Sequence, residues 1–493
     1  MKFQPIVTIP LFGTNVLNED CLEVLRDLQE NSIDAIVTDP PYGLGFMGKG
    51  WDSFAGTRNP GSRGGDARKG LLPGYGRGGT SEDRLAYRHK EAKAFGAWFT
   101  TWAVLALRVL KPGAHLLAFG GTRTFHRLAC ALEDAGFEVR DCLSWNYASG
   151  FPKSLDVAKA IDVGLGAKEL RTFKCKNPAA RPGNFGTGVE GETGVTSSGW
   201  RKPSRPDKTN SATAEASRWE GWGTALKPAW EPVIVARKPL IGNVADNVLA
   251  YGTGAINIDA CRIETGSRTL IKSNRRSGNN TYGDGLCGSV NLGETSLGRW
   301  PANVVFDEEA ARVLDAQSGV RTSGKPGKGG GVNTSAAFGA DNREPGYDML
   351  GYGDKGGASR FFFCAKASRK ERDAGLEDLP DVKNDRFPTR FCTQCEKNVP
   401  EVGSCGCENP EIEFREAKRS KNIHPTVKPI SLMEWLLKLV VPPGGIVLDT
   451  FAGSGTTGCA AEKLGIRALL VEREAEYIPI INGRLKYWRT HRE

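Results

Sequence analysis

Two short motifs near opposite ends of the chain combine the residue types that group transfer to a flat base requires. The first, at 39–43, reads Asp-Pro-Pro-Tyr-Gly, and the second, at 451–458, reads Phe-Ala-Gly-Ser-Gly-Thr-Thr-Gly. Each follows a short apolar run, at 33–37 and at 445–449, that is typical of a buried parallel strand. Because ligands bind at the carboxyl ends of such strands, we expect both motifs to border one crevice.

The glycine loop is predicted to bind a nucleotide-like cofactor. Gly453, Gly455 and Gly458 let the backbone approach a ligand, and the helix that follows offers free amide donors. A second strand ends in Glu472, nineteen residues after Gly453, where a carboxylate can accept hydrogen bonds from both ribose hydroxyls. This local pattern suits both NAD and S-adenosyl-L-methionine. The loop hydroxyls favour the latter, and a hydride-transfer enzyme has no use for the Asp-Pro-Pro-Tyr turn.

The Asp-Pro-Pro-Tyr turn has the groups that methylation of an exocyclic amine needs. Such an amine is a poor nucleophile because its lone pair is delocalised into the ring, and acceptors on its protons favour a pyramidal nitrogen. Asp39 supplies one acceptor, and the carbonyl of Pro40 supplies another, held in place because Pro40 and Pro41 restrict the backbone. Tyr42 offers a face on which an extruded base can stack. Positioning and electrostatics would then supply most of the rate.

Strands and helices alternate along the regular parts of the sequence. The spacing predicts a helix at 95–110, ended by 111–113, then a strand at 115–119, a helix at 127–135 and a strand at 138–145. This alternation indicates an α/β fold with a Rossmann-like parallel sheet. From about 165 to 355 the periodicity is lost, which predicts an irregular inserted region and not a second Rossmann unit.

The combination of motifs resembles the S-adenosylmethionine-dependent DNA amino-methyltransferases that modify adenine N6 or cytosine N4. The motif order is similar to that of the permuted β group, and segments at 119–124, 149–154, 222–228 and 424–429 resemble its phage and prophage branch. The resemblance implies a methyltransferase sheet, S-adenosyl-L-methionine as cofactor and a flipped base in double-stranded DNA as substrate. It favours adenine N6 over cytosine N4. Dimers occur in this family, and the resemblance leaves open both a homodimer and a restriction endonuclease partner.

The same resemblance assigns roles to individual residues. Asp39, Pro40, Pro41 and Tyr42 would form the catalytic turn. The cofactor would be bound by residues of three regions, namely Asp20 near the adenine ring, Lys428 at the carboxylate end, and Asp449, Phe451, Ala452, Gly453, Ser454, Gly455, Thr456 and Glu472 of the loop and its flanking strands. Glu19 stands where the family usually has glycine, which weakens the match at Asp20.

These assignments predict five parts of the chain. They are a catalytic half of the core at 10–163 with a mobile Gly/Arg-rich loop at 43–82, an inserted target-recognition region at 164–355, a return to the core at 356–390, a zinc-ribbon-like insertion at 391–410 and a cofactor-binding half at 423–490. Trp200, Trp219, Trp222 and Trp230 lie among basic residues of the insertion, where they could stack on bases while the basic residues contact phosphates. A solvated insertion with the tryptophans in a minor core is the alternative.

Four cysteines cluster within sixteen positions of the sequence. Cys392 and Cys395 form a C-x-x-C pair, and Cys405 and Cys407 form a tighter C-x-C pair. Four thiolates at this spacing suit tetrahedral zinc, and with all positions filled the metal would be structural. Free surface thiols are the alternative.

The bulk composition excludes some classes of protein and leaves others open. The 493 residues carry a formal charge of +9, and the surplus lies in the irregular segments, with fifteen Lys/Arg against nine acids at 151–240. No apolar stretch reaches the length of a membrane span, so we expect a cytoplasmic protein without membrane contact.

The rivals to a DNA methyltransferase are a protein-glutamine or RNA methyltransferase, a catalytically silent zinc-containing DNA-binding protein and an NAD oxidoreductase.

Overall fold

The described residues of this computed structural model form two compact units. The structure describes residues 7, 9–44, 52–54, 81–150, 154–166, 211–275, 286–322, 327–328, 348–349, 354–366, 369–380, 389–392, 397–399, 412–415 and 421–491. The first unit comprises 1–149, 229–378 and 424–493, and the second comprises 150–228 and 379–423. Most of the predicted loop at 43–82 lies outside the described residues.

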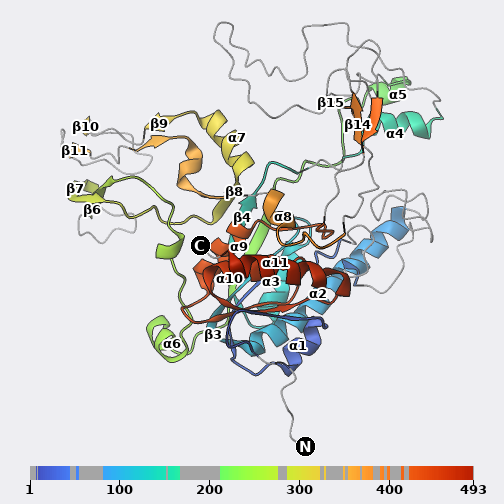
Figure 1. The fold of residues 1–493 in the computed structure, drawn as a ribbon. Helices are drawn as coiled ribbons and strands as arrows, with labels where there is room; N and C mark the ends of the chain where they lie inside the picture. The colour runs from blue at the N-terminus through green and yellow to red at the C-terminus, as the bar shows by residue number, and fades with distance from the viewer. Residues whose placement is uncertain are drawn as a thin grey trace, which may run out of the picture. The chain divides into compact units, whose positions relative to one another are not determined.

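A nine-stranded sheet forms the centre of the first unit (Figure 1). Its strand order is β1-β18-β17-β2-β3-β5-β4-β8-β13. The strands are β1 (Thr14–Leu17), β2 (Ile33–Thr38), β3 (Leu110–Phe119), β4 (Glu138–Asn146), β5 (Trp230–Arg237), β8 (Val304–Asp307), β13 (Phe363–Ala365), β17 (Ile446–Asp449) and β18 (Arg467–Val471). All neighbours are parallel except β5, which runs antiparallel to both β3 and β4. The predicted α/β fold with a mainly parallel, Rossmann-like sheet is confirmed.

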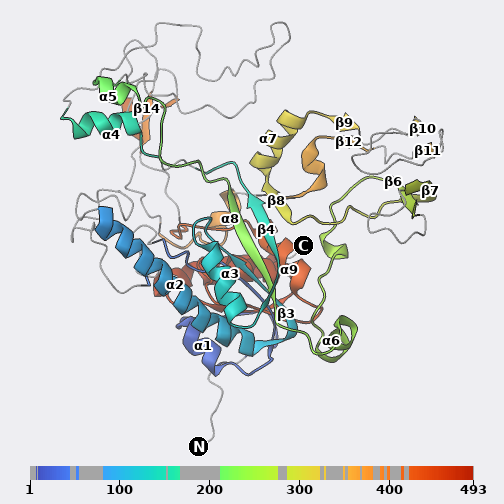
Figure 2. The same cartoon turned by 180° about the vertical axis from the view of Figure 1, so that it is seen from behind.

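Helices cover both faces of this sheet (Figures 1 and 2). One face packs against α1 (Cys21–Asp27), α2 (Ser81–Val109) and α3 (Phe125–Asp134), and the other against α9 (Ile430–Val440), α10 (Thr456–Leu464) and α11 (Ile478–Thr490). Strand β18 shows why the central strands read as continuous apolar runs: Ala468 and Leu470 face one helical layer, and Leu469 and Val471 face the other. Among the described residues, none of the helices combines the length and apolar character that a bilayer crossing requires.

The strands that precede the two motifs are neighbours at the middle of the sheet. Val447 of β17 pairs with Ala35 of β2, and Leu448 pairs with Ile36. The Thr38 hydroxyl at the end of β2 donates a hydrogen bond of 2.6 Å to Asp449 Oδ1 at the end of β17. Two segments that lie more than 400 residues apart in the sequence are therefore joined at their carboxyl ends.

Some element boundaries differ from the prediction. Helix α2 begins at Ser81 instead of residue 95, because its first turns are mostly charged and polar residues without an apolar stripe. Strand β3 begins at Leu110 and includes 111–113, which the sequence suggested would only end the helix. The register between β2 and β3 shifts after the Ile33–Leu110 pair, and Gly113 has φ 76°, so these residues form an irregularity at the start of the strand.

The predicted boundaries of the insertion at 164–355 also differ from the structure. Strands β5 and β8 belong to the central sheet, and α6 (Val244–Tyr251) and α7 (Glu308–Ser318) lie in the same unit. Both strands pair with segments distant in sequence, and β5 pairs antiparallel, so the local alternation that reveals a parallel sheet is missing there. The core therefore resumes at 229 and not at 356.

The remaining elements lie outside the central sheet. The first unit also contains η3 (Asp259–Cys261), the hairpin of β6 (Arg268–Arg275) and β7 (Leu286–Thr295), β9 (Arg321–Thr322), β10 (Gly327–Lys328), β11 (Asp348–Met349), β12 (Lys355–Gly356), η5 (Ala358–Phe361), α8 (Arg369–Asp373) and η6 (Ala475–Tyr477). The second unit contains α4 (Val157–Gly164), α5 (Ala214–Ser217) and a three-stranded antiparallel sheet of β15 (Lys397–Val399), β14 (Thr389–Cys392) and β16 (Ile412–Arg415).

Candidate active site

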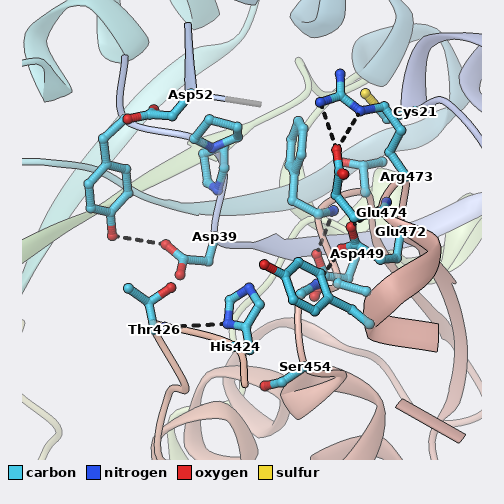
Figure 3. Close-up of a pocket in the computed structure, with 18 of the residues that line it drawn as sticks. Cys21, Asp39, Asp52, His424, Thr426, Asp449, Ser454, Glu472, Arg473 and Glu474 are labelled. Atoms are coloured by element: carbon cyan, nitrogen blue, oxygen red, sulfur yellow. Dashed lines mark hydrogen bonds and ion pairs between the residues drawn. The ribbon is translucent and has the colours of Figure 1, made fainter. Parts of the chain in front are cut away.

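A cavity of about 420 Å³ opens where β1, β2, β17 and β18 end. The structure brings almost all of the predicted catalytic and cofactor-binding residues to its wall, namely Asp20, Asp39, Pro40, Pro41, Tyr42, Lys428, Asp449, Phe451, Ala452, Gly453, Ser454, Thr456 and Glu472. Figure 3 shows Asp39, Asp449, Ser454 and Glu472 around this cavity. Gly455 is the exception: it does not line the cavity and instead shapes the loop. The two motifs therefore share one pocket, as the sequence predicted.

The glycine loop between β17 and α10 needs glycine at two positions. Gly453 has φ 55° and Gly455 has φ 75°, a backbone region that other residues rarely adopt. A Cβ atom on Gly453 would lie 2.8 Å from Nε2 of His424, and one on Gly455 would lie 2.8 Å from the Ile481 side chain. The loop can therefore lie against both neighbours only without side chains at these positions.

A buried arginine holds this loop from α11. Arg484 has no exposed surface, and its NH1 group donates to Ser454 O at 2.6 Å, Ser454 Oγ at 2.9 Å and Thr456 Oγ1 at 3.1 Å. The guanidinium thus fixes both the backbone and the hydroxyls of the loop. It also places a positive charge beneath the N-terminus of α10, where the helix dipole already favours an anion.

Glu472 follows β18 and faces the loop from the other side. Its Oε2 accepts the amide of Gly453 at 2.7 Å, and its Oε1 accepts the amide of Glu474 at 2.8 Å. Burial raises the pKa of Glu472 from its usual value to about 7, although the two amides oppose this rise. Each carboxylate oxygen retains a second lone pair with which it can accept a ligand hydroxyl.

Asp449 ties the two motif strands together. It accepts the hydroxyl of Thr38 at 2.6 Å, the hydroxyl of Thr457 at 2.5 Å and the amide of Phe451 at 3.1 Å. Burial raises the pKa of Asp449 to about 6, and the two hydroxyls oppose this rise. The side chain is thus shared between β2, the loop and the first turn of α10.

Asp39 stands in a network of polar groups at the end of β2. Its Oδ1 accepts the hydroxyl of Tyr42 at 2.9 Å, and its Oδ2 lies 2.9 Å from Nζ of Lys428. The same Nζ lies 2.9 Å from Oε2 of Glu231, which also accepts the Tyr42 hydroxyl at 3.2 Å. Burial and the two carboxylates raise the pKa of Tyr42 well above its usual value, so the phenol stays protonated.

The ammonium of Lys428 is buried among acids and rings. Burial alone would lower the pKa of Lys428, but Asp39 and Glu231 outweigh it and the pKa lies above its usual value. Nζ lies 4.7 Å from the ring centroid of Phe119 and 5.6 Å from that of Trp145. The resemblance assigned this lysine to the carboxylate end of the cofactor, whereas in the structure its ammonium contacts the Asp-Pro-Pro-Tyr turn.

His424 lies over the glycine loop. Its ring packs edge-to-face on Tyr477 with centroids 4.8 Å apart, and its Nδ1 accepts the amide of Thr426 at 3.4 Å. Burial lowers the pKa of His424 to about 4, so the ring is neutral at neutral pH and carries its proton on Nε2. Figure 3 shows the imidazole between Thr426 and the loop residue Ser454.

The remaining predicted acid, Asp20, caps a helix at the rim of the cavity. Its Oδ1 accepts the amide of Leu22 at 2.8 Å at the N-terminus of α1. Asp52, which the sequence did not single out, accepts the amides of Gly43 at 2.6 Å and Leu44 at 3.1 Å. Asp52 thereby ties the residues after the turn to the segment that follows them.

Sequence reasoning missed several residues of this pocket. Glu231, His424, Asp52, Trp98 and Tyr477 line the cavity but were not predicted. His424 and Thr426 belong to the 424–429 segment that carried part of the family resemblance, so that segment could have pointed to them. No local signal marks Glu231, because it reaches the site only through the pairing of β5.

Three of the four clustered cysteines lie outside the described residues. Cys395, Cys405 and Cys407 are not described, and Cys392 ends β14 without a described side chain. Among the side chains that are described, no group of three or more His, Cys, Asp or Glu could hold a metal ion. The zinc site stays a prediction.

A protein-family profile matches most of the chain. The family is described as DNA methylase, of the N6/N4 type, and the match covers residues 33–170 and 196–483. The match includes both motifs and the strands that position them. It also spans β5 and β8, which the structure places in the central sheet.

Two characterised relatives share parts of the chain. The type II methyltransferase M.HindIII of Haemophilus influenzae is 24% identical over 246 residues, which are 49% of this chain and 64% of the relative. The type II methyltransferase M2.DpnII of Streptococcus pneumoniae is 43% identical over 63 residues, which are 13% of this chain and 24% of the relative. The chain thus matches less than two thirds of the length of each.

Solved structures of DNA methylases align with the chain at TM-scores below 0.5. The cytosine-N4-specific PvuII DNA methyltransferase has a TM-score of 0.39 at 12% identity, with 97% of this chain and 88% of that chain covered. A putative DNA modification methylase from Thermus thermophilus, complexed with S-adenosyl-L-methionine, has a TM-score of 0.33 at 13% identity, with 96% and 94% covered.

Proposed function

This chain belongs to the N6/N4 DNA methylase family, and from that membership we propose that it transfers a methyl group from S-adenosyl-L-methionine to the N6 amine of adenine in double-stranded DNA. One observation carries the proposal: Asp39 and the glycine loop line the same cavity, at the ends of neighbouring strands. Asp39, as the acceptor for the amine, and the glycine loop, as the binding loop for the methyl donor, therefore line the same cavity. The Asp-Pro-Pro-Tyr form of the turn favours adenine, and methylation of cytosine N4 is the alternative outcome.

The residues of the loop fit S-adenosyl-L-methionine. Gly453 and Gly455 keep the backbone open to a ligand, and the carboxylate of Glu472 can accept ribose hydroxyls. Ser454 and Thr456, held by Arg484, lie at the N-terminus of α10, which suits the carboxylate of the amino-acid end. Asp20 and Phe451 would complete the adenosine side. When bound, the cofactor supplies a methyl group on a sulfonium that is already activated.

Asp39 and its neighbours would orient the target amine. The carboxylate of Asp39 would accept a hydrogen bond from the amine and stabilise the positive charge that its nitrogen develops as the methyl group arrives, and it can then take up the proton that the nitrogen loses. The carbonyl of Pro40 is the second acceptor, held by two prolines. Such preorganised groups stabilise the transition state without a strong base. A base inside a duplex cannot reach them, so it must be flipped out of the stack.

Tyr42 is predicted to stack on the flipped base. Tyr42→Ala should reduce kcat/KM for DNA about 10- to 100-fold, because stacking on an aromatic side chain contributes about 1–3 kcal/mol per base. Tyr42→Phe keeps the ring and loses the hydrogen bonds of the hydroxyl to Asp39, Glu231 and Lys428, so its loss should stay below about 10-fold. Steady-state methylation of an oligonucleotide duplex measures both variants. Equal losses in the two variants would contradict a stacking role.

Sequencing of host DNA with modified-base detection, after expression of the chain, tests the proposed function. N6-methyladenine at a defined motif is the expected result. N4-methylcytosine at a defined motif would assign the alternative base. The absence of any modified base, with a cofactor analogue still bound, would favour a catalytically silent DNA-binding protein.

The second unit is proposed to contact DNA. Trp219 and Trp222 are exposed there and pack edge-to-face with ring centroids 5.3 Å apart. Exposed tryptophans in a basic region can stack on or wedge between bases. The homodimer and the restriction endonuclease partner stay predictions.

The zinc hypothesis has its own test. Elemental analysis of protein purified without oxygen should find about one zinc per chain, because four thiolates fill a tetrahedral site. Cys395→Ser should lower the zinc content, while Cys130→Ser, at an exposed cysteine of α3, should not. Protein that retains methylation activity but holds no zinc would remove the hypothesis.

A further inference from the structure

Glu231 reaches the cavity through the antiparallel strand of the sheet. Strand β5 starts beside the carboxyl ends of β3 and β4, because it runs in the opposite direction: Glu231 pairs with Trp145 near the end of β4, and Val233 pairs with Phe119 at the end of β3. The second residue of β5 therefore lies where the parallel strands present their functional groups. We propose that Glu231 is a positioning residue for methyl transfer, which holds Lys428 against Asp39. This inference rests on the proposed function.

Each N–H donor of the Lys428 ammonium has an acceptor. Nζ lies 2.9 Å from Asp39 Oδ2, 2.9 Å from Glu231 Oε2 and 3.3 Å from the hydroxyl of Tyr42. An ammonium has three N–H donors, and the three acceptors account for all of them. The Lys428 side chain is 8% exposed and that of Glu231 is 21% exposed, so solvent screens this pair weakly. The ammonium therefore has little freedom to leave Asp39.

The charges explain why two acids surround one lysine. Asp39 and Glu231 are negative and Lys428 is positive, so the cluster carries one net negative charge. The amine nitrogen becomes positive as its bond to the methyl carbon forms, and a net negative cluster stabilises that charge. If Lys428 paired with Asp39 alone, the pair would be neutral and this stabilisation would largely vanish. Glu231 thus offsets the charge of Lys428 while the lysine still orients Asp39.

The aromatic rings around Lys428 support the same role. The centroids of Phe119, Trp145 and Tyr42 lie 4.7, 5.6 and 5.8 Å from Nζ. Rings at these distances stabilise a cation and restrict its side chain. They cannot replace a carboxylate as a hydrogen-bond acceptor, so Glu231 remains the partner that balances Asp39.

A series of charge-neutralising substitutions tests the inference. Glu231→Gln removes one negative charge with little change of shape and should lower kcat about 10- to 100-fold, with the KM for the cofactor changed less than about threefold. Lys428→Met should also lower kcat, because it leaves two acids unpaired. The double variant restores one net negative charge, so its loss should be smaller than the product of the two single losses.

Glu138→Gln is the matched control. Glu138 pairs with Arg237 at the other end of β5, with 2.6 Å between Oε2 and NH2, and this pair does not line the cavity. The kcat of the Glu138→Gln variant should stay within about twofold of that of the unmodified protein. Thermal melting and the Kd for S-adenosyl-L-homocysteine, measured for every variant, report folding and the cofactor site separately from turnover.

Three outcomes would overturn the inference while the proposed function stands. They are full kcat in Glu231→Gln, losses that multiply in the double variant, and a loss in Glu231→Gln that is matched by weaker analogue binding. If the unmodified protein methylates no DNA, the proposed function itself fails, and that result is obtained before any variant is made.

Discussion

Asp39→Ala is expected to lower kcat for DNA methylation about 1,000-fold while the Kd for S-adenosyl-L-homocysteine changes less than about threefold. The substitution removes the carboxylate that would accept the hydrogen bond from the amine. It also leaves Lys428 paired with Glu231 alone, so the cluster becomes neutral at the point where positive charge develops. Single-turnover transfer of a tritiated methyl group to an oligonucleotide duplex measures the loss.

Two further variants sharpen this test. Asp39→Asn keeps the size and one acceptor oxygen but removes the charge, so its activity should fall between those of the alanine variant and the unmodified protein. Asp259→Ala changes an exposed aspartate, 2.7 Å from Arg262 and outside the cavity, and should leave the rate unchanged. A fully active Asp39→Ala protein would refute the assignment of the turn.

Glu472→Gln is expected to weaken binding of S-adenosyl-L-homocysteine about 10- to 100-fold, because hydrogen bonds to a charged group contribute about 1.5–3 kcal/mol. The amide can accept from a ribose hydroxyl through only one oxygen and without charge. The NH2 group of the new glutamine would also face the N–H group of Gly453 or Glu474, and both of these donate to the carboxylate in the unmodified protein. Isothermal titration at pH 8 measures the affinity, with Glu308→Gln in the first turn of α7 as the control.

Glu472→Gln should weaken cofactor binding but increase the stability of the protein without cofactor. The pKa of Glu472 is about 7 in the folded protein, above the usual 4.5, so folding favours the protonated form. The protonated Glu472 side chain therefore stabilises the folded protein. This contribution is fully present below about pH 4.5 and is lost as the pH rises through about 7. Without cofactor, Glu472→Gln should therefore be more stable than the unmodified protein at pH 8, by about 1–3 kcal/mol, and similar to it near pH 5. A stability difference that does not change between these pH values would contradict the raised pKa.

The sequence was sufficient to predict the centre of the fold and the two motifs that meet in the pocket. Residues 33–37 and 445–449 are mostly apolar runs followed by distinctive turns, and such signals are local. The rule that ligands bind at the carboxyl ends of parallel strands then placed Asp39 near Gly453 without knowledge of the pairing. The family resemblance added Lys428, Asp449 and Asp20, which also line the cavity.

The parts that were missed depend on long-range pairing. Strand β5 falls within the predicted insertion at 164–355, because nothing local shows that it pairs between β3 and β4. Glu231 was missed for the same reason. Helix α2 was predicted too short, since its polar first turns lack the apolar stripe on which the prediction depended.

The pairing of β2 with β17 has a consequence for biosynthesis. These adjacent strands are separated by more than 400 residues, and Thr38 meets Asp449 across that interval. On a ribosome that adds about 5–20 residues per second, the amino-terminal half of the sheet must wait for tens of seconds with one edge of β2 unpaired. An exposed apolar strand edge is a site of aggregation, so a nascent chain of this protein should depend on chaperones until residues 446–471 emerge.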